Sequence, residues 1–166
     1  MRNSLRTHGT TIAYRDGIMA CDSQWTSAEM VLSSACKIER LPSGALYGAS
    51  GYTDDRELKL LIAMVKQEEE LPLASVLEKV TIECQALLIL PNGQVFRIMT
   101  GDNAEVCPIE APFAAVGSGQ GIALGAMAHG ASALQAVTIA CDFDIYTRRP
   151  VHSLTLKKVK KNGKRI

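Results

Sequence analysis

The junction Gly9-Thr10 near the amino end places a hydroxyl group at the start of a predicted strand. If the chain were cut between these two residues, Thr10 would carry both its hydroxyl and a free α-amino group. Such an amine has a pKa of about 7.7–8, so much of it can accept a proton near neutral pH. A hydroxyl nucleophile needs a base of this kind. The junction therefore predicts one residue that supplies both nucleophile and base for attack on a carbonyl carbon.

Such a site also needs a cation that stabilises the ionised hydroxyl, and an acid that holds the cation. Lys37 and Asp22 are candidates, because both lie on predicted strands that could neighbour the first one. The glycine-rich segment 48–51 could supply a backbone N–H to an oxyanion. Each feature alone also has an ordinary structural explanation, as a surface lysine or a turn glycine.

Other catalytic chemistries have little support. The histidines are His8, His129 and His152, which supply a Ser-His-Asp site poorly. His129 precedes a glycine at the end of a predicted helix, and a structural role is favoured for it. The five cysteines contain no CxxC pair, so a zinc site is not predicted. Their scatter, together with the lack of an apolar stretch in residues 1–9, predicts reduced thiols in a cytoplasmic protein without a signal peptide.

The elements that must position these residues begin with short strands joined by tight turns. Alternating patterns predict antiparallel strands at 11–14, 18–21, 36–41 and 45–49. Helical spacing follows at 54–70 and 73–80. Strands return at 84–90, 94–99, 105–109 and 113–116, then helices at 119–130 and 131–141, and extended segments at 146–147 and 151–156. The pattern predicts an α+β protein whose antiparallel sheets and helices stack as layers.

Length and composition favour one globular domain. The chain has 166 residues, 47% of them hydrophobic, and none of its apolar runs approaches the roughly 18 residues of a membrane span. The net charge of +1 is distributed unevenly along the chain. Residues 157–166 hold six Lys or Arg and residues 1–9 hold two, so residues 10–156 carry a net charge of −7. The tail could contact phosphates. However, the acidic body and an aromatic content of 5% argue against a nucleic-acid-binding protein, and a solvated terminus is the ordinary interpretation.

Six motifs follow one another along the chain: Thr10-Thr11-Ile12, Asp22-Ser23-Gln24, Cys36-Lys37-Ile38, Gly48-Ala49-Ser50-Gly51 with Asp55, Gly117-Ser118-Gly119, and Asp142 through Tyr146-Thr147. In this order and spacing they resemble the proteasome β-subunit family, most closely its bacterial HslV branch. The resemblance covers residues 10–156. It implies the N-terminal-nucleophile hydrolase fold, a four-layer αββα sandwich in which two antiparallel sheets pack between helix layers. It also implies a threonine endopeptidase that acts on protein or peptide substrates inside a homo-oligomeric ring or double ring.

The resemblance also implies a role for individual residues. Thr10 would be the nucleophile and, through its amine, the base, while Lys37 would lower the pKa of the hydroxyl and Asp22 would orient Lys37. Gly51 would form the oxyanion hole. Ser118 and Asp142 would complete the hydrogen bonds around the amine.

The resemblance extends to substrate and ion binding. A wall that includes Ala35, Ala49 and Thr53, with Trp25 nearby, would suit an apolar substrate side chain. No cofactor is required, although backbone carbonyls of residues corresponding to Cys141, Asp144 and Thr147 hold sodium in some HslV-like members. An ATP-dependent unfoldase is a further partner that the resemblance suggests.

The chain departs from the HslV pattern in three places. Nine residues precede Thr10, as in proteasome subunits that remove their own leader, so residues 1–9 are predicted to be a cleavable leader. The segment 72–83 is compressed, which leaves ring size open, and the basic tail 157–166 has no counterpart in the family. An alternative interpretation is a non-catalytic ring subunit of the same fold that keeps its leader.

Overall fold

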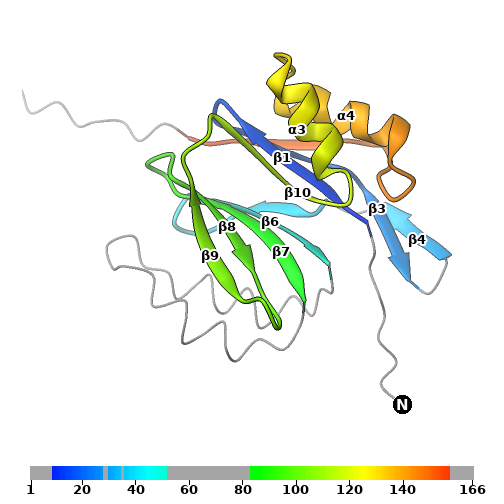
Figure 1. Ribbon diagram of the computed structural model, residues 1–166, viewed down its shortest axis with the longest axis horizontal. Coiled ribbons are helices and arrows are strands. Elements are labelled where there is room, and N and C mark those ends of the chain that lie inside the picture. Colours follow the sequence, from blue (N-terminus) through cyan, green and yellow to red (C-terminus); the bar gives the residue numbers. More distant parts are fainter. Residues whose placement is uncertain (1–8, 28–29, 35, 52–82, 158–166) are drawn as a thin grey trace, which may run out of the picture.

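The computed structural model describes residues 9–27, 30–34, 36–51 and 83–157. Two antiparallel sheets and two helices form layers over this part of the chain (Figure 1). The predicted α+β class is therefore confirmed. The first predicted pair of helices (54–70 and 73–80) lies outside the described residues, as do most of the expected leader and basic tail. Within the described residues, no helix is long and apolar enough to cross a membrane.

The first sheet has four strands in the order β10-β1-β2-β11. Its central hairpin, β1 (Thr11–Arg15) and β2 (Ile18–Cys21), turns at Asp16-Gly17, where both residues have positive φ. A two-residue turn with positive φ matches the twist of a hairpin. The outer strands are β10 (Phe113–Gly117) beside β1 and β11 (His152–Thr155) beside β2.

The second sheet has five strands in sequential order. They are β5 (Ile38–Arg40), β6 (Leu46–Gly51), β7 (Cys84–Ile89), β8 (Val95–Met99) and β9 (Glu105–Ile109). The predicted strands in both sheets are thus confirmed. In addition, β3 (Gln24–Ser27) and β4 (Met30–Ser34) form a separate hairpin that the sequence pattern did not reveal.

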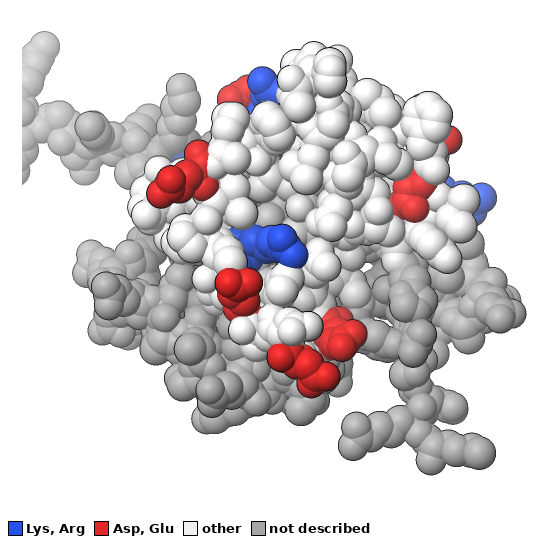
Figure 2. Space-filling model, in the orientation of Figure 1, with Lys and Arg blue, Asp and Glu red and all other residues white. Residues whose placement is uncertain are grey.

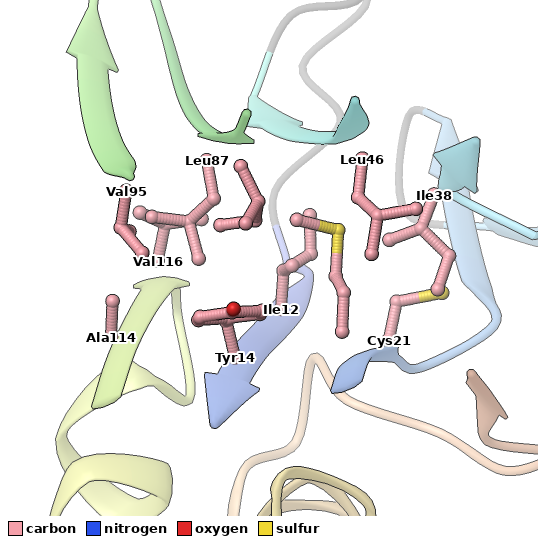
Figure 3. Close-up of a cluster of buried hydrophobic side chains, with 11 residues drawn as sticks. Ile12, Tyr14, Cys21, Ile38, Leu46, Leu87, Val95, Ala114 and Val116 are labelled. Carbon is pink, nitrogen blue, oxygen red and sulfur yellow. The ribbon is translucent and has the colours of Figure 1, made fainter. Parts of the chain in front are cut away.

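Large apolar side chains fill the space between the two sheets, and Figure 3 shows them facing one another from both sides. Ile12 of β1 and Val116 of β10 meet Leu87 of β7, and all three are fully buried. Because side chains alternate along a strand, the residues between them point to the opposite face of the sheet.

On that opposite face, β1, β2 and β10 present Ala13, Ala20 and Ala115 to helices α3 (Gln120–Ala128) and α4 (Ala133–Phe143). Alanine on both sides lets helix and sheet approach closely. The helix α4 begins with a capping box between Ser132 and Gln135. The predicted extended segment at 146–147 is wrong: the N–H of Thr147 bonds to the carbonyl of Asp144, which makes this segment a turn.

Candidate active site

The side chains of Thr10, Lys37 and Asp22 meet at the end of the first sheet. Lys37 Nζ lies 2.8 Å from Thr10 Oγ1 and 2.9 Å from Asp22 Oδ1. The carboxylate is fully buried, and only 9% of the lysine side chain is exposed. An ion pair with so little water around it is screened weakly, so the ammonium acts strongly on the neighbouring hydroxyl. The cation and acid predicted from the sequence are therefore in contact with the predicted nucleophile.

The hairpin geometry explains why Asp22 reaches this position. Thr10 directly precedes β1 and Asp22 directly follows β2, so an antiparallel pair brings them to the same end of the sheet. Asp22 Oδ1 accepts the N–H of Thr11 at 3.0 Å. Its Oδ2 accepts the N–H of Gln24 at 2.9 Å and of Arg148 at 3.2 Å. Three backbone donors fix this carboxylate, and it in turn fixes Lys37.

Burial changes the acid–base behaviour of the groups around the hydroxyl. It lowers the pKa of Lys37 from the ordinary 10.5, while the charge of Asp22 acts in the opposite direction. The Cys21 sulfur accepts the backbone N–H of Lys37 at 3.5 Å. Burial raises the pKa of this thiol to about 12, so Cys21 stays neutral and does not compete for the lysine charge.

A second group of polar side chains lies near the backbone of Thr10. Ser118 Oγ is 3.5 Å from the backbone oxygen of Thr10 and donates to Asp144 Oδ2 at 2.6 Å. Thr147 Oγ1 donates to the same carboxylate oxygen at 2.5 Å and is 2.7 Å from Thr11 Oγ1. The chain of contacts thus runs from Ser118 through Asp144 and Thr147 to the residue next to Thr10.

Asp144, and not Asp142, accepts the hydrogen bonds of this network. Asp142 is half-exposed and pairs with Arg149 at 2.7 Å. It lies within α4, whereas Asp144 caps the carboxyl end of that helix and turns back toward Ser118. The spacing Asp-x-x-Thr from 144 to 147 is a turn signal that could have identified Asp144.

Gly117 is a further site residue, for which the sequence pattern alone predicted no role. Its φ is +99°, and a Cβ there would lie 1.8 Å from the backbone oxygen of Thr10. Only glycine lets β10 pass so close to Thr10, which places Ser118 beside it.

Gly51, the predicted oxyanion donor, lies at the end of β6 with φ +116°. A Cβ at this position would lie 2.7 Å from the backbone oxygen of Glu83. Gly51, Gly9 and Ser118 line one cavity of about 600 Å³. A substrate in this cavity would therefore contact the residues around Thr10.

The residues predicted for the substrate wall are less fully placed. Ala49 packs with the apolar cluster on the outer face of the five-stranded sheet, and Trp25 is 39% exposed on β3. Ala35 and Thr53 lie outside the described residues.

The predicted sodium ligands, Cys141, Asp144 and Thr147, line a separate cavity of about 350 Å³. The carbonyl of Asp144 already accepts the N–H of Thr147 at 3.1 Å. Arg148 and Arg149 line the same cavity, and their charges oppose a bound cation. These residues therefore fit a sodium ion poorly.

No protein-family model and no curated protein matches the chain. Among solved structures, it is similar to Thiobacillus denitrificans BPH, with a TM-score of 0.57 and 23% identity over 89% of this chain and 98% of that one. It is equally similar, at 22% identity and the same TM-score and coverage, to Thiobacillus denitrificans BPH in complex with epoxomicin. At these identities the likeness establishes the fold alone.

Proposed function

We propose that the chain is a proteasome-like threonine peptidase, of the HslV type, that hydrolyses peptide bonds through an amino-terminal Thr10. The observation that carries the proposal is the contact of a buried, acid-paired Lys37 with the Thr10 hydroxyl at 2.8 Å. A hydroxyl is a weak nucleophile at neutral pH, and a fixed cation beside it favours the ionised form. The fold similarity adds support, because the complex with epoxomicin, a proteasome inhibitor, has the same fold.

The first step of the proposed mechanism is removal of residues 1–9. Thr10 Oγ1 donates to the carbonyl oxygen of Gly9 at 2.6 Å, and Lys37 Nζ lies 3.4 Å from that oxygen. The hydroxyl oxygen bonds to the Gly9 carbonyl carbon, the carbon–nitrogen bond breaks, and the hydroxyl proton passes to the Thr10 nitrogen. Water then hydrolyses the ester. The leader leaves as a carboxylic acid, and Thr10 has a free amine and hydroxyl.

Cleavage of a substrate repeats this chemistry with the free amine as the base. The amine takes the hydroxyl proton, the oxygen attacks the substrate carbonyl carbon, and the amine returns the proton to the departing amino group. The resulting ester on Thr10 is hydrolysed by water. Lys37 stabilises the ionised hydroxyl, and the N–H of Gly51 stabilises the oxyanion. One such donor contributes about 3 kcal/mol to lowering the barrier.

Ser118 and Asp144 act as positioning residues in this proposal, because their contacts hold the backbone around Thr10. Replacing Asp144 with alanine removes the acceptor of both Ser118 and Thr147, and kcat/KM is expected to fall about tenfold to a hundredfold. Replacing Asp142 with alanine removes only an exposed pair and is expected to change kcat/KM less than about twofold. Equal losses in the two variants, measured with one fluorogenic peptide, would contradict the assignment.

Gly9 is expected to be essential for self-cleavage. Its φ is +105°, and a Cβ would lie 2.1 Å from the Cβ of Tyr146. A Gly9→Ala variant must therefore move the peptide bond away from the hydroxyl, and we expect removal of the leader to slow at least about tenfold. The mass of the protein, followed over hours after purification, measures this rate. Cleavage at the wild-type rate would show that the peptide bond is not held as described.

The proposal is tested by peptide hydrolysis with and without epoxomicin. The purified full chain should hydrolyse an internally quenched peptide, and epoxomicin should stop hydrolysis at one inhibitor per active subunit. Hydrolysis that epoxomicin does not affect would point to a contaminating enzyme or another mechanism. No hydrolysis, with an intact leader, would favour a non-catalytic subunit. We also propose that the chain assembles into a homo-oligomeric ring, that an ATP-dependent unfoldase delivers its substrates, and that it is located in the cytoplasm.

A further inference from the structure

The cavity beside Thr10 continues across the five-stranded sheet to an acidic rim. Gly51 of β6 pairs with Cys84 of β7, and the turn after β8 adds Asp102 and Asn103 to the lining. Since neighbouring strands are about 4.8 Å apart, two strand spacings place Asp102, the far end of this rim, about 10 Å from Gly51. That distance corresponds to about three residues of an extended peptide.

Close packing and hydrogen bonds hold the residues of this rim in place. Glu83 lies directly before β7, and its side chain crosses Gly101, where a Cβ would lie 2.7 Å from Glu83 Cγ. The missing side chain at position 101 therefore makes room for the glutamate beside Asp102. Thr100 joins the end of β8 to the start of β7. Its N–H bonds to the carbonyl of Cys84 at 3.1 Å, and its Oγ1 accepts the N–H of Cys84 at 3.0 Å.

Within the part of the chain that the structure describes, the acidic groups of this rim have no cationic partner. Glu83 and Asp102 are exposed, and among the described residues neither has a salt-bridge partner. Gln85 lines the same cavity, and its buried Oε1 accepts no hydrogen bond within the described part of the chain. Arg97, on β8, bonds to the sulfur of Met99 and does not line the cavity. In Figure 2, acidic side chains gather in the region where Figure 1 shows the end of β8 and the beginning of β9.

We propose that this rim is a subsite for a basic side chain, arginine or lysine, within about three residues of the bond that is cleaved. The two exposed carboxylates, Glu83 and Asp102, offer acceptors and negative charge, and a guanidinium or ammonium group offers the donors and the opposite charge. This inference rests on the proposed function, since it assigns specificity to the same cleft.

The test compares quenched peptides that differ only in arginine or citrulline, placed in turn at each of three positions on either side of the scissile bond. Citrulline keeps the shape of arginine without its charge. The wild type should show a higher kcat/KM for arginine at one position, by about fivefold, as expected for two partly solvated charge pairs. The ratio should fall to about one in Glu83→Gln/Asp102→Asn and stay at the wild-type value in Glu110→Gln, an exposed acid at the far end of β9.

The outcomes separate this inference from the function on which it rests. If epoxomicin labels the enzyme but arginine and citrulline peptides are cleaved equally at every position, the subsite is wrong and the peptidase stands. A preference for arginine that the double variant retains also overturns the subsite. If no peptide is cleaved and no label is found, the proposed function fails and the subsite fails with it.

Discussion

Replacing Thr10 with alanine is expected to reduce kcat/KM for peptide hydrolysis by about five to six orders of magnitude, to background. The substitution removes the atom that bonds to the substrate carbon, and loss of a nucleophile has effects of this size in enzymes that form an acyl intermediate. The same variant should keep residues 1–9, because the leader is removed by the same oxygen. Thr10→Ser, which retains a hydroxyl, should remain active at a reduced rate.

The fold should tolerate the Thr10→Ala substitution. The hydroxyl contacts only Gly9 and Lys37 among the described residues, and loss of such a contact costs about 1 kcal/mol. Thermal unfolding of the variant should therefore resemble that of the wild type. Peptide hydrolysis by Thr10→Ala above about one per cent of the wild-type rate, in a preparation free of other proteases, would exclude Thr10 as the nucleophile.

Replacing Lys37 with alanine is expected to reduce kcat/KM by about three orders of magnitude, the effect of removing one preorganised electrostatic group. The ammonium is the cation in contact with the Thr10 hydroxyl in the described structure, and the buried pair with Asp22 is weakly screened. Lys157→Ala, at an exposed lysine beyond β11, is the matched control and should retain full activity. Wild-type turnover by Lys37→Ala would show that the lysine does not assist the hydroxyl.

Stability must be separated from catalysis in this experiment. Removing the lysine leaves a fully buried carboxylate without its cation, which costs about 3–5 kcal/mol in comparable pairs. The three backbone donors to Asp22 offset part of this cost. The double variant Lys37→Met/Asp22→Asn removes both charges and should unfold at a higher temperature than Lys37→Ala. It should be as inactive, because the cation is still missing.

Local patterns were enough to predict the elements that carry Thr10, Asp22 and Lys37. The Asp16-Gly17 turn fixes the register of β1 and β2, and this register alone brings residues 10 and 22 to one end of the sheet. The position of Lys37 depends on the neighbouring strand β5. This strand pairs with β6, and its Ile38 packs with Ile12 and Cys21 in the core between the sheets.

The remaining features depend on tertiary contacts that no local pattern specifies. The hairpin of β3 and β4 has a bulge between Trp25 and Thr26, so its residues do not alternate regularly. Asp142 and Asp144 are both plausible by type, and only the end of α4 decides which one turns toward Ser118. The close approach of Gly117 to Thr10 likewise comes from the pairing of two strands that are about a hundred residues apart.

The most direct test of the central claim is the intact mass of the purified protein before and after incubation with epoxomicin. We expect a mass that lacks residues 1–9, and then an increase by one inhibitor per chain that maps to Thr10 and is absent in Thr10→Ala. A mass that still includes residues 1–9 and does not change with epoxomicin would contradict the account.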